Sequence, residues 1–192
     1  KNRDLVREVV DEAKKHGIKV YVMIGHTTNP ELYSKHPDWA QRSKNGQTIA
    51  MDTDPVEIRN KTIRWPLMCL NSPFLHYVLN EVEEVLSYDV NGVFLDSFRY
   101  MPDMEKACFC SYCKEKFKTE TGFDLPIIED WESLSYRESF LWRYMVNVNA
   151  IKTVYEFVKS KNSEFSLIYN SHPAGWNGRA NRIVEMASDF ID

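Results

Sequence analysis

Residues 92–96 read Gly-Val-Phe-Leu-Asp (GVFLD), a short apolar run that ends in an acidic residue. The run follows a helical pattern over about residues 72–88, with Ser72 as the expected N-cap and Pro73 in the first turn. A strand that directly follows a helix and is apolar throughout is typical of parallel βαβ units. This stretch therefore predicts a parallel sheet with Asp96 at the carboxyl end of a strand.

The same alternation of helix and strand extends to both sides of this stretch. Three further helices are expected from the helical spacing of apolar residues, near 3–16, 131–161 and 179–187. Three further strands are expected from apolar runs, at 18–24, 165–169 and 189–192. The pattern predicts an α/β fold in one domain over residues 1–192. A (β/α)8 TIM barrel usually takes about 250 residues, so we expect a partial barrel with about four parallel strands.

The alternative fold is a doubly wound open sheet. That fold commonly carries a glycine-rich phosphate loop after a strand, and neither 25–28 (GHTT) nor 175–178 (GWNG) has this fingerprint. The connections that follow the strands are long and rich in aromatic residues, as barrel loops are when they build an active site. The sequence opens at Lys1 within a helical pattern and without Met, so we also expect a piece of a longer chain.

Four cysteines form the most specific pattern in the sequence, namely Cys69, Cys108, Cys110 and Cys113. The last three form C-x-C-x-x-C just before a helix. Four thiolates can occupy the corners of a tetrahedron around zinc, and a set with no open position is a structural site. We therefore expect a structural zinc ion held within residues 69–113. A disulfide framework, disfavoured in a domain of this size, and unrelated buried thiols are the alternatives.

These residues resemble a known family. The run from Cys69 to Pro73 (CLNSP), followed by the C-x-C-x-x-C run, resembles the zinc-containing β-galactosidases of glycoside hydrolase family forty-two and the hypothetical glycosyl-hydrolase-like families. The loop 36–46, with HPDW and KNG, is similar to an HPEW…DG loop of those relatives. The resemblance covers roughly residues 18–122. It implies a barrel, glycosidase activity and one zinc ion shared by the four cysteines.

One difference from that family concerns the strand at residues 92–96. The β-galactosidases carry an Asn-Glu pair at the end of their fourth strand, whereas Asp96 is followed here by Ser97 and Phe98. The GVFLD run is more similar to the fourth strand of retaining α-glycosidases and α-fucosidases, in which the Asp at the strand end is the nucleophile. The resemblance thus implies that Asp96 is the catalytic nucleophile of a glycoside hydrolase.

Further candidate residues lie on the loops and strand ends around Asp96. Glycoside hydrolysis normally uses two carboxyl groups, and the second is either Asp192 or a residue beyond this sequence. Six side chains are assigned to substrate binding, as hydrogen-bonding groups or as rings that stack on a sugar: His26, Trp39, Arg99, Asn170, His172 and Trp176. The structural alternative for Asp96 is a salt bridge to Arg99. His26 and His172 could instead belong to a catalytic metal site, but no HxH or HExxH spacing supports one.

The amino-acid composition limits the kinds of partner that the protein can bind. The 192 residues are 43% hydrophobic and 27% charged with a net charge of −4, which opposes a disordered chain and a nucleic-acid-binding surface. No apolar run approaches the roughly 20 residues of a membrane-spanning helix. We expect a carbohydrate substrate, no nucleic acid and no membrane partner, and leave a homo-oligomer open. Localisation is otherwise unknown, and reduced cysteines favour the cytoplasm.

Two other functions stay open at this point. A catalytically inactive barrel that binds carbohydrate or serves as a scaffold is favoured by the missing Asn-Glu pair. A zinc-stabilised nucleic-acid or protein interaction module is opposed by the acidic charge and the apolar parallel strands. A second carboxylate within about 10 Å of Asp96 would separate catalysis from simple binding.

Overall fold

The computed structural model describes residues 3–24, 27–50, 56–58, 61–63, 65–96, 98–100, 107–170 and 179–192. Its elements, in chain order, are α1 (Leu5–Lys15), β1 (Tyr21–Ile24), α2 (Pro30–Lys35), η1 (Pro37–Trp39), β2 (Val56–Ile58), β3 (Lys61–Ile63), α3 (Phe74–Leu86), β4 (Gly92–Asp96), α4 (Ser111–Thr121), α5 (Leu134–Lys161), β5 (Ser166–Asn170), α6 (Arg179–Ala187) and η2 (Ser188–Phe190). The chain divides into two compact units. The first contains Lys1–Gly25, His76–Phe98 and Ile151–Asp192, and the second contains His26–Leu75 and Arg99–Ala150.

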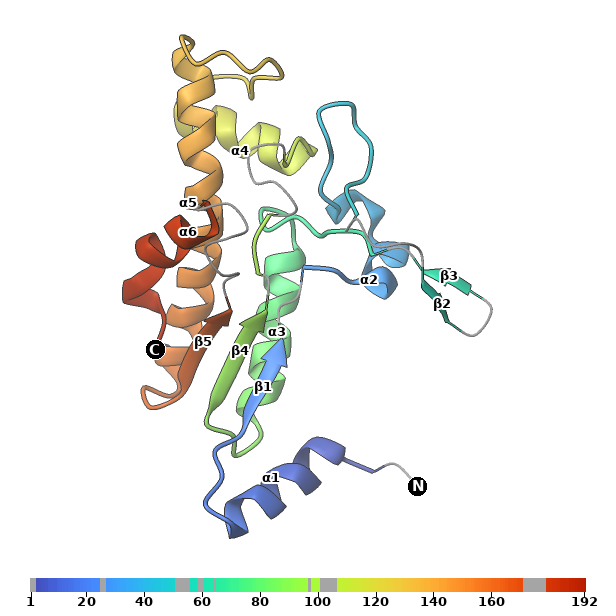
Figure 1. Cartoon of the computed structure of the whole chain (residues 1–192), viewed down its shortest axis with the longest axis vertical. Coiled ribbons are helices and arrows are strands. Elements are labelled where there is room, and N and C mark those ends of the chain that lie inside the picture. The colour runs from blue at the N-terminus through green and yellow to red at the C-terminus, as the bar shows by residue number, and fades with distance from the viewer. Residues whose placement is uncertain are drawn as a thin grey trace. The chain divides into compact units, whose positions relative to one another are not determined.

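The first unit is built on a parallel sheet of three strands in the order β1-β4-β5, which point the same way in Figure 1. In the register, Val22 pairs with Val93, Val93 pairs with Leu167, and Asp96 pairs with Asn170. The predicted parallel α/β arrangement is confirmed, and β4 has the predicted bounds. The described residues form a three-stranded parallel sheet rather than a closed barrel.

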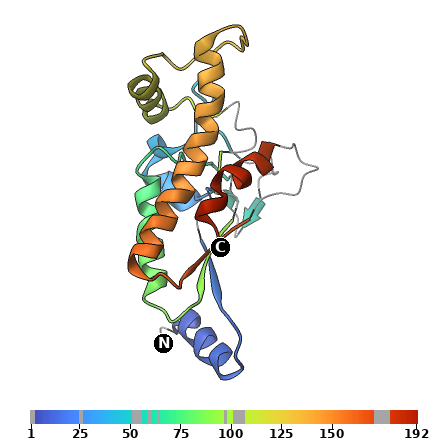
Figure 2. The same cartoon turned by 90° about the vertical axis from the view of Figure 1, so that its left-hand side faces the viewer.

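The two faces of this sheet differ in their covering. Figure 2 shows α3 and the C-terminal part of α5 along one face. Val93, Leu95 and Leu167 are fully buried, whereas the alternate residues Phe94 and Ile168 are only half-buried. Apolar parallel strands such as residues 92–96 predict a sheet with helices on both faces. In this part of the chain, however, one face is much better covered than the other. Strand residues alternate between faces, so Asp96 shares the more open face with Phe94.

Local chemistry explains where several elements of this unit begin, end and pair. The Asp4 side chain accepts a hydrogen bond from the Arg7 N–H and so caps α1 at its start. After α1, Gly17 takes a φ of +65°, which a glycine adopts without strain. At Gly92 a Cβ atom would lie 2.3 Å from the backbone oxygen of Ser166, so only glycine permits the close pairing of β4 with β5.

The end of the chain corrects one prediction. Residues 189–192 are not a regular strand, because Ser188–Phe190 form a short 3-10 helix. Asp192 then bonds to the middle of β5: its N–H donates to the Leu167 oxygen at 2.9 Å, and its carboxylate accepts from the Leu167 N–H at 2.8 Å. The carboxylate also pairs with Lys159 at 2.9 Å. The apolar pair Phe190-Ile191 suggested a strand, but only the last residue meets the sheet.

The second unit is mostly loops and helices. It holds α2, η1, the antiparallel hairpin β2–β3, α4 and the first half of α5. Isolated bridges tie its loops together, among them Ala40 with Met68 and Arg42 with Thr48. Phe117 of α4 packs edge-on against Trp142 of α5, with ring centroids 5.3 Å apart. Among the described helices of both units, none is long and apolar enough to cross a membrane.

Candidate functional site

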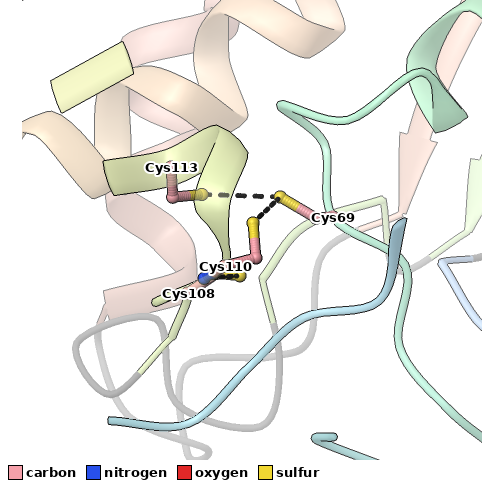
Figure 3. Close-up of side chains that lie close together, drawn as sticks. All are labelled: Cys69, Cys108, Cys110 and Cys113. Carbon is pink, nitrogen blue, oxygen red and sulfur yellow. Dashed lines mark hydrogen bonds between the residues drawn. The ribbon is translucent and has the colours of Figure 1, made fainter. Parts of the chain in front are cut away.

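The four cysteines of the second unit converge, as Figure 3 shows. All four are buried, and their sulfur atoms lie within 4.8 Å of one another. The Cys69 sulfur is 3.4 Å from that of Cys113 and 3.5 Å from that of Cys110. These separations exceed the roughly 2.05 Å of a disulfide bond, so the thiols are free. The predicted clustering is confirmed, and the disulfide framework is not present.

Backbone turns hold these side chains in place. The Ser72 hydroxyl donates to the Cys69 carbonyl at 2.6 Å and accepts from the Phe74 N–H, so the expected cap residue ties Cys69 to the start of α3. Cys110 is the N-cap of α4, and Cys113 lies in the first turn of that helix. The N–H groups of Arg42 and Cys110 donate to the Cys108 sulfur at 3.2 and 3.4 Å.

A second layer of polar groups surrounds the sulfurs. The Tyr100 hydroxyl lies 3.1 Å from the Cys113 sulfur and 3.4 Å from the Cys69 sulfur. Asn71 donates from Nδ2 to the Cys113 sulfur at 3.4 Å, and its Oδ1 accepts from Lys116 Nζ at 3.0 Å. Donors of this kind stabilise thiolates and fix their orientation. Sequence reasoning did not single out Tyr100, Asn71 or Lys116.

Helix α5 supports this layer with three buried polar residues at four-residue spacing, namely Ser139, Arg143 and Asn147. Asn147 accepts from the Tyr100 N–H at 2.7 Å. Arg143 donates from Nε to the Ala107 carbonyl, which precedes Cys108, at 2.6 Å. Residues at i, i+4 and i+8 share one side of a helix. This polar stripe was the available signal, and sequence reasoning considered only the apolar residues of the helix.

The thiols of the cluster differ in their pKa values. Burial raises the pKa of Cys69 and of Cys108, and hydrogen bonds with Cys110 and Cys113 raise both further. Hydrogen bonds from Cys108 and the other two thiols lower the pKa of Cys110. Cys110 is therefore the thiol of the cluster that loses its proton most readily. A metal that takes all four sulfurs must displace the remaining protons, so its binding depends on pH.

The cluster fits a zinc ion. Zn–S bonds of about 2.3 Å in a tetrahedron place the sulfurs about 3.8 Å apart, and the observed separations lie around that value, up to 4.8 Å. Four soft sulfur donors leave no open coordination position, which is typical of a structural site. The four cysteines would hold the ion and join the loops before α3 and α4.

Asp96 and Asn170, in the first unit, lie side by side at the carboxyl ends of β4 and β5. Asn170 donates from Nδ2 to the Asp96 Oδ1 atom at 2.7 Å. Because parallel strands end at one edge of a sheet, the sequence predicts Gly25-His26, Asp96 and Asn170 at the same end. The register confirms this for Asp96 and Asn170, whereas Gly25 and His26 lie outside the described residues. Side chains at this end of parallel strands are where α/β folds place ligands. Asn170 thus fixes the orientation of a half-buried carboxylate.

The other candidate carboxylate, Asp192, lies elsewhere. It bonds to Leu167, three residues before Asn170, on the side of β5 away from β4. Two strand spacings of about 4.8 Å and three residues of about 3.3 Å place it on the order of 14 Å from Asp96. That exceeds the separation of two cooperating carboxyl groups, and Lys159 already pairs with it. This position disfavours Asp192, one of the two alternatives that the sequence left open for the second carboxyl group.

The predicted substrate-binding residues are placed as follows. The Trp39 ring stacks on His36, with centroids 4.0 Å apart, and the Trp39 carbonyl accepts from the Cys69 N–H. Arg99 is 5% exposed, and its backbone carbonyl accepts from the Thr27 hydroxyl at 3.5 Å. Asn170 is the partner of Asp96 described above. The remaining three residues, His26, His172 and Trp176, lie outside the described residues.

Solved structures with the same fold are glycosidases. An α-L-fucosidase isoenzyme 2 from Paenibacillus thiaminolyticus matches 88% of this chain and 23% of its own, with a TM-score of 0.66 and 21% identity. A β-galactosidase from the psychrophilic Marinomonas ef1 matches 95% of this chain and 32% of its own, with a TM-score of 0.64 and 12% identity. A β-galactosidase from Bacillus circulans sp. alkalophilus matches 86% and 28%, with a TM-score of 0.59 and 15% identity.

These likenesses concern the fold. The chain spans about a quarter to a third of the length of the three solved structures. Among curated proteins, none matches the sequence. The family model described as "Hypothetical glycosyl hydrolase 6" matches residues 1–97, which is more than half of the 192 residues. The match contains the paired strands β1 and β4 and the strand end at Asp96, and the chain belongs to the hypothetical glycosyl hydrolase 6 family.

Proposed function

We propose that this chain is part of a (β/α)8-barrel glycoside hydrolase in which Asp96 is the nucleophile. The observation that carries the proposal is the pairing of Asp96 with Asn170 at the carboxyl end of a parallel sheet, in a chain of a glycosyl-hydrolase family. Residues 1–192 form one piece of the barrel domain. Its substrate in this proposal is a glycoside. By their names, the similar structures act on fucosides and galactosides.

The chemistry assigned to Asp96 is that of a retaining glycosidase. Its carboxylate attacks the anomeric carbon, and the bond to the leaving oxygen breaks as an acid protonates that oxygen. Water then hydrolyses the resulting ester and restores the carboxylate. Asn170 holds the attacking group through its 2.7 Å hydrogen bond. The acid is left unassigned, since Asp192 is too far away.

Substrate contacts at other positions belong to the same proposal. His26, Asn170 and His172 would bond to sugar hydroxyls, and Arg99 would supply a positive charge. Trp39 and Trp176 would stack on the apolar face of a sugar ring.

Hydrolysis of aryl glycosides tests this proposal. Asp96→Asn keeps the shape of the side chain and removes its charge, so turnover should fall by several orders of magnitude while the circular dichroism spectrum stays unchanged. Asp11→Asn is the matched control, because Asp11 is an exposed aspartate on α1. A panel of p-nitrophenyl α-fucosides and β-galactosides covers the two classes of similar structure. Equal turnover of Asp96→Asn and the parent would remove Asp96 from the catalytic role.

We also propose that the cysteine cluster binds one structural zinc ion. The support is the donor set of four buried sulfurs within 4.8 Å. Elemental analysis should find about one zinc per chain, as a closed Cys₄ site requires. Cys69→Ser should lose most of the zinc and lower the unfolding midpoint, whereas Ser111→Ala, an exposed change beside the cluster, should keep both. A parent protein that takes up no zinc would contradict this assignment.

A catalytically inactive protein that binds carbohydrate is the second candidate. The observation that favours it is the position of Asp192, which removes the one partner carboxylate that the sequence offered. In that case the parent would bind glycosides, and the substitution Asp96→Asn would abolish no hydrolysis.

A further inference from the structure

A concave site lies in the unit that carries the cysteine cluster. A cavity of about 340 Å³ is lined by the turn at residues 43–47, the loop at 126–129, Phe109 and two residues of α5. This volume is in the range of pockets that hold small ligands. None of these residues belongs to the set assigned above to catalysis, substrate or zinc. The cavity is therefore separate from the sites described above.

Arg143 gives this cavity a buried charge. Its side chain is 2% exposed, and it lines the cavity from α5. Nε donates to the Ala107 carbonyl at 2.6 Å, while Nη1 donates to the Ser139 carbonyl and hydroxyl at 3.2 and 3.0 Å. These bonds use Nε and Nη1 and hold the plane of the guanidinium group in place. A guanidinium held this firmly presents donors in a fixed plane.

The rest of the lining combines planar polar groups with aromatic ones. The amides of Asn45 and Gln47 lie on the exposed turn and offer both donors and acceptors. Phe109 and Tyr136 are each 8% exposed and contribute rings. A sugar unit has hydroxyl groups at its edge and a C–H face that packs on such rings. This mixture of amides, guanidinium and rings suits a sugar better than a purely apolar ligand.

The charged side chains around the cavity are of both signs. Lys44 and Arg143 are positive, and Glu129 is negative. Glu129 is held at the rim, since Trp131 donates from Nε1 to its Oε1 atom at 3.3 Å. A ligand of either sign would therefore meet a like charge as well as an opposite one.

We propose that this cavity binds one neutral sugar unit, through the Arg143 guanidinium and the amides of Asn45 and Gln47, against the Phe109 and Tyr136 rings. The choice of a sugar rests on the proposed glycosidase function. The residues are different from Asp96 and its partner, so binding here can be measured apart from hydrolysis. The cavity is then a carbohydrate-binding site of the second unit.

Titration of the zinc-loaded chain, followed by ¹H–¹⁵N NMR, tests the inference. The probes are methyl β-galactoside, methyl α-fucoside and methyl β-glucoside, with methyl β-glucuronide as the charged comparison. We expect saturable binding of a neutral probe, with shifts in the amides of residues 43–47. Asn45→Ala and Gln47→Ala change exposed residues, so the folded structure should persist. Each should weaken binding by about fivefold, the share of one hydrogen bond, whereas Lys19→Ala on the other unit should not.

Three outcomes would overturn the inference. One is that no neutral probe shows saturable binding at concentrations up to about 50 mM, because an affinity weaker than this would not make a useful binding site. Another is equal binding by the parent, Asn45→Ala and Gln47→Ala. The third is tighter binding of the glucuronide than of every neutral probe. Asp96→Asn should bind the probe at residues 43–47 as the parent does, so loss of turnover and loss of this subsite are separate results.

Discussion

Replacing Asn147 by alanine tests how α5 supports the cysteine cluster. Asn147 is fully buried, and its Oδ1 accepts from the Tyr100 N–H at 2.7 Å, while its Nδ2 donates to the Arg143 carbonyl at 2.6 Å. Asn147→Ala leaves the Tyr100 N–H buried without this acceptor, at a cost of about 1–3 kcal/mol. The small cavity left behind adds about 1 kcal/mol. We therefore expect the free energy of unfolding to fall by about 2–4 kcal/mol.

Urea unfolding followed by circular dichroism measures this change in the zinc-loaded protein. Zinc affinity, measured by competition with a chelator, should fall as well, because Tyr100 places its hydroxyl against the sulfurs of Cys69 and Cys113. Asn149→Ala is the matched control on the same helix, where Asn149 is exposed, and should change stability by less than about 0.5 kcal/mol. Equal stability and zinc affinity in both variants would refute this account of the polar stripe.

Two further predictions concern the sheet of the first unit. Gly92→Ala places a Cβ atom 2.3 Å from the Ser166 backbone oxygen, so the thermal midpoint should fall by about 5 °C or more; an unchanged midpoint would contradict the pairing of β4 with β5. Burial opposes the Asp192 carboxylate, but Lys159 and the Leu167 N–H prevail and lower its pKa below 3.8. The stability that Asp192 contributes is therefore present above pH 3.8 and lost as pH falls through the lower folded pKa. Urea midpoints at pH 7 and pH 3 should differ less in Asp192→Asn than in the parent, and an identical difference would contradict this assignment.

The sequence predicted the parts of the fold that depend on local patterns. The apolar run Val93-Phe94-Leu95 lies between a helix and a long loop, and it forms a parallel strand with the predicted bounds. The cysteines were predictable because spacing restricts where three thiols on six consecutive residues can point. Ser72 followed by Pro73 marked the start of α3 for the same local reason.

The parts that sequence reasoning missed depend on contacts between distant residues. Asn147 and Tyr100 are 47 positions apart, and only the folded chain brings the amide to the N–H that it satisfies. Arg143 lies among apolar residues of α5, so its partner Ala107 could not be read from helical spacing. The Asp192 side chain bonds to a strand interior instead of ending a strand, since Lys159 and the Leu167 N–H stabilise it there.

The role of Asp96 as a nucleophile is tested most directly by trapping its covalent intermediate. A retaining glycosidase treated with an activated 2-deoxy-2-fluoro glycoside accumulates a glycosyl ester on its nucleophile. Mass spectrometry of the digested protein should find that adduct on the peptide that contains Asp96, with no adduct in Asp96→Asn. An adduct on another carboxylate would contradict the role of Asp96 as the nucleophile. Turnover of an aryl glycoside by Asp96→Asn at the parent rate would contradict it as well.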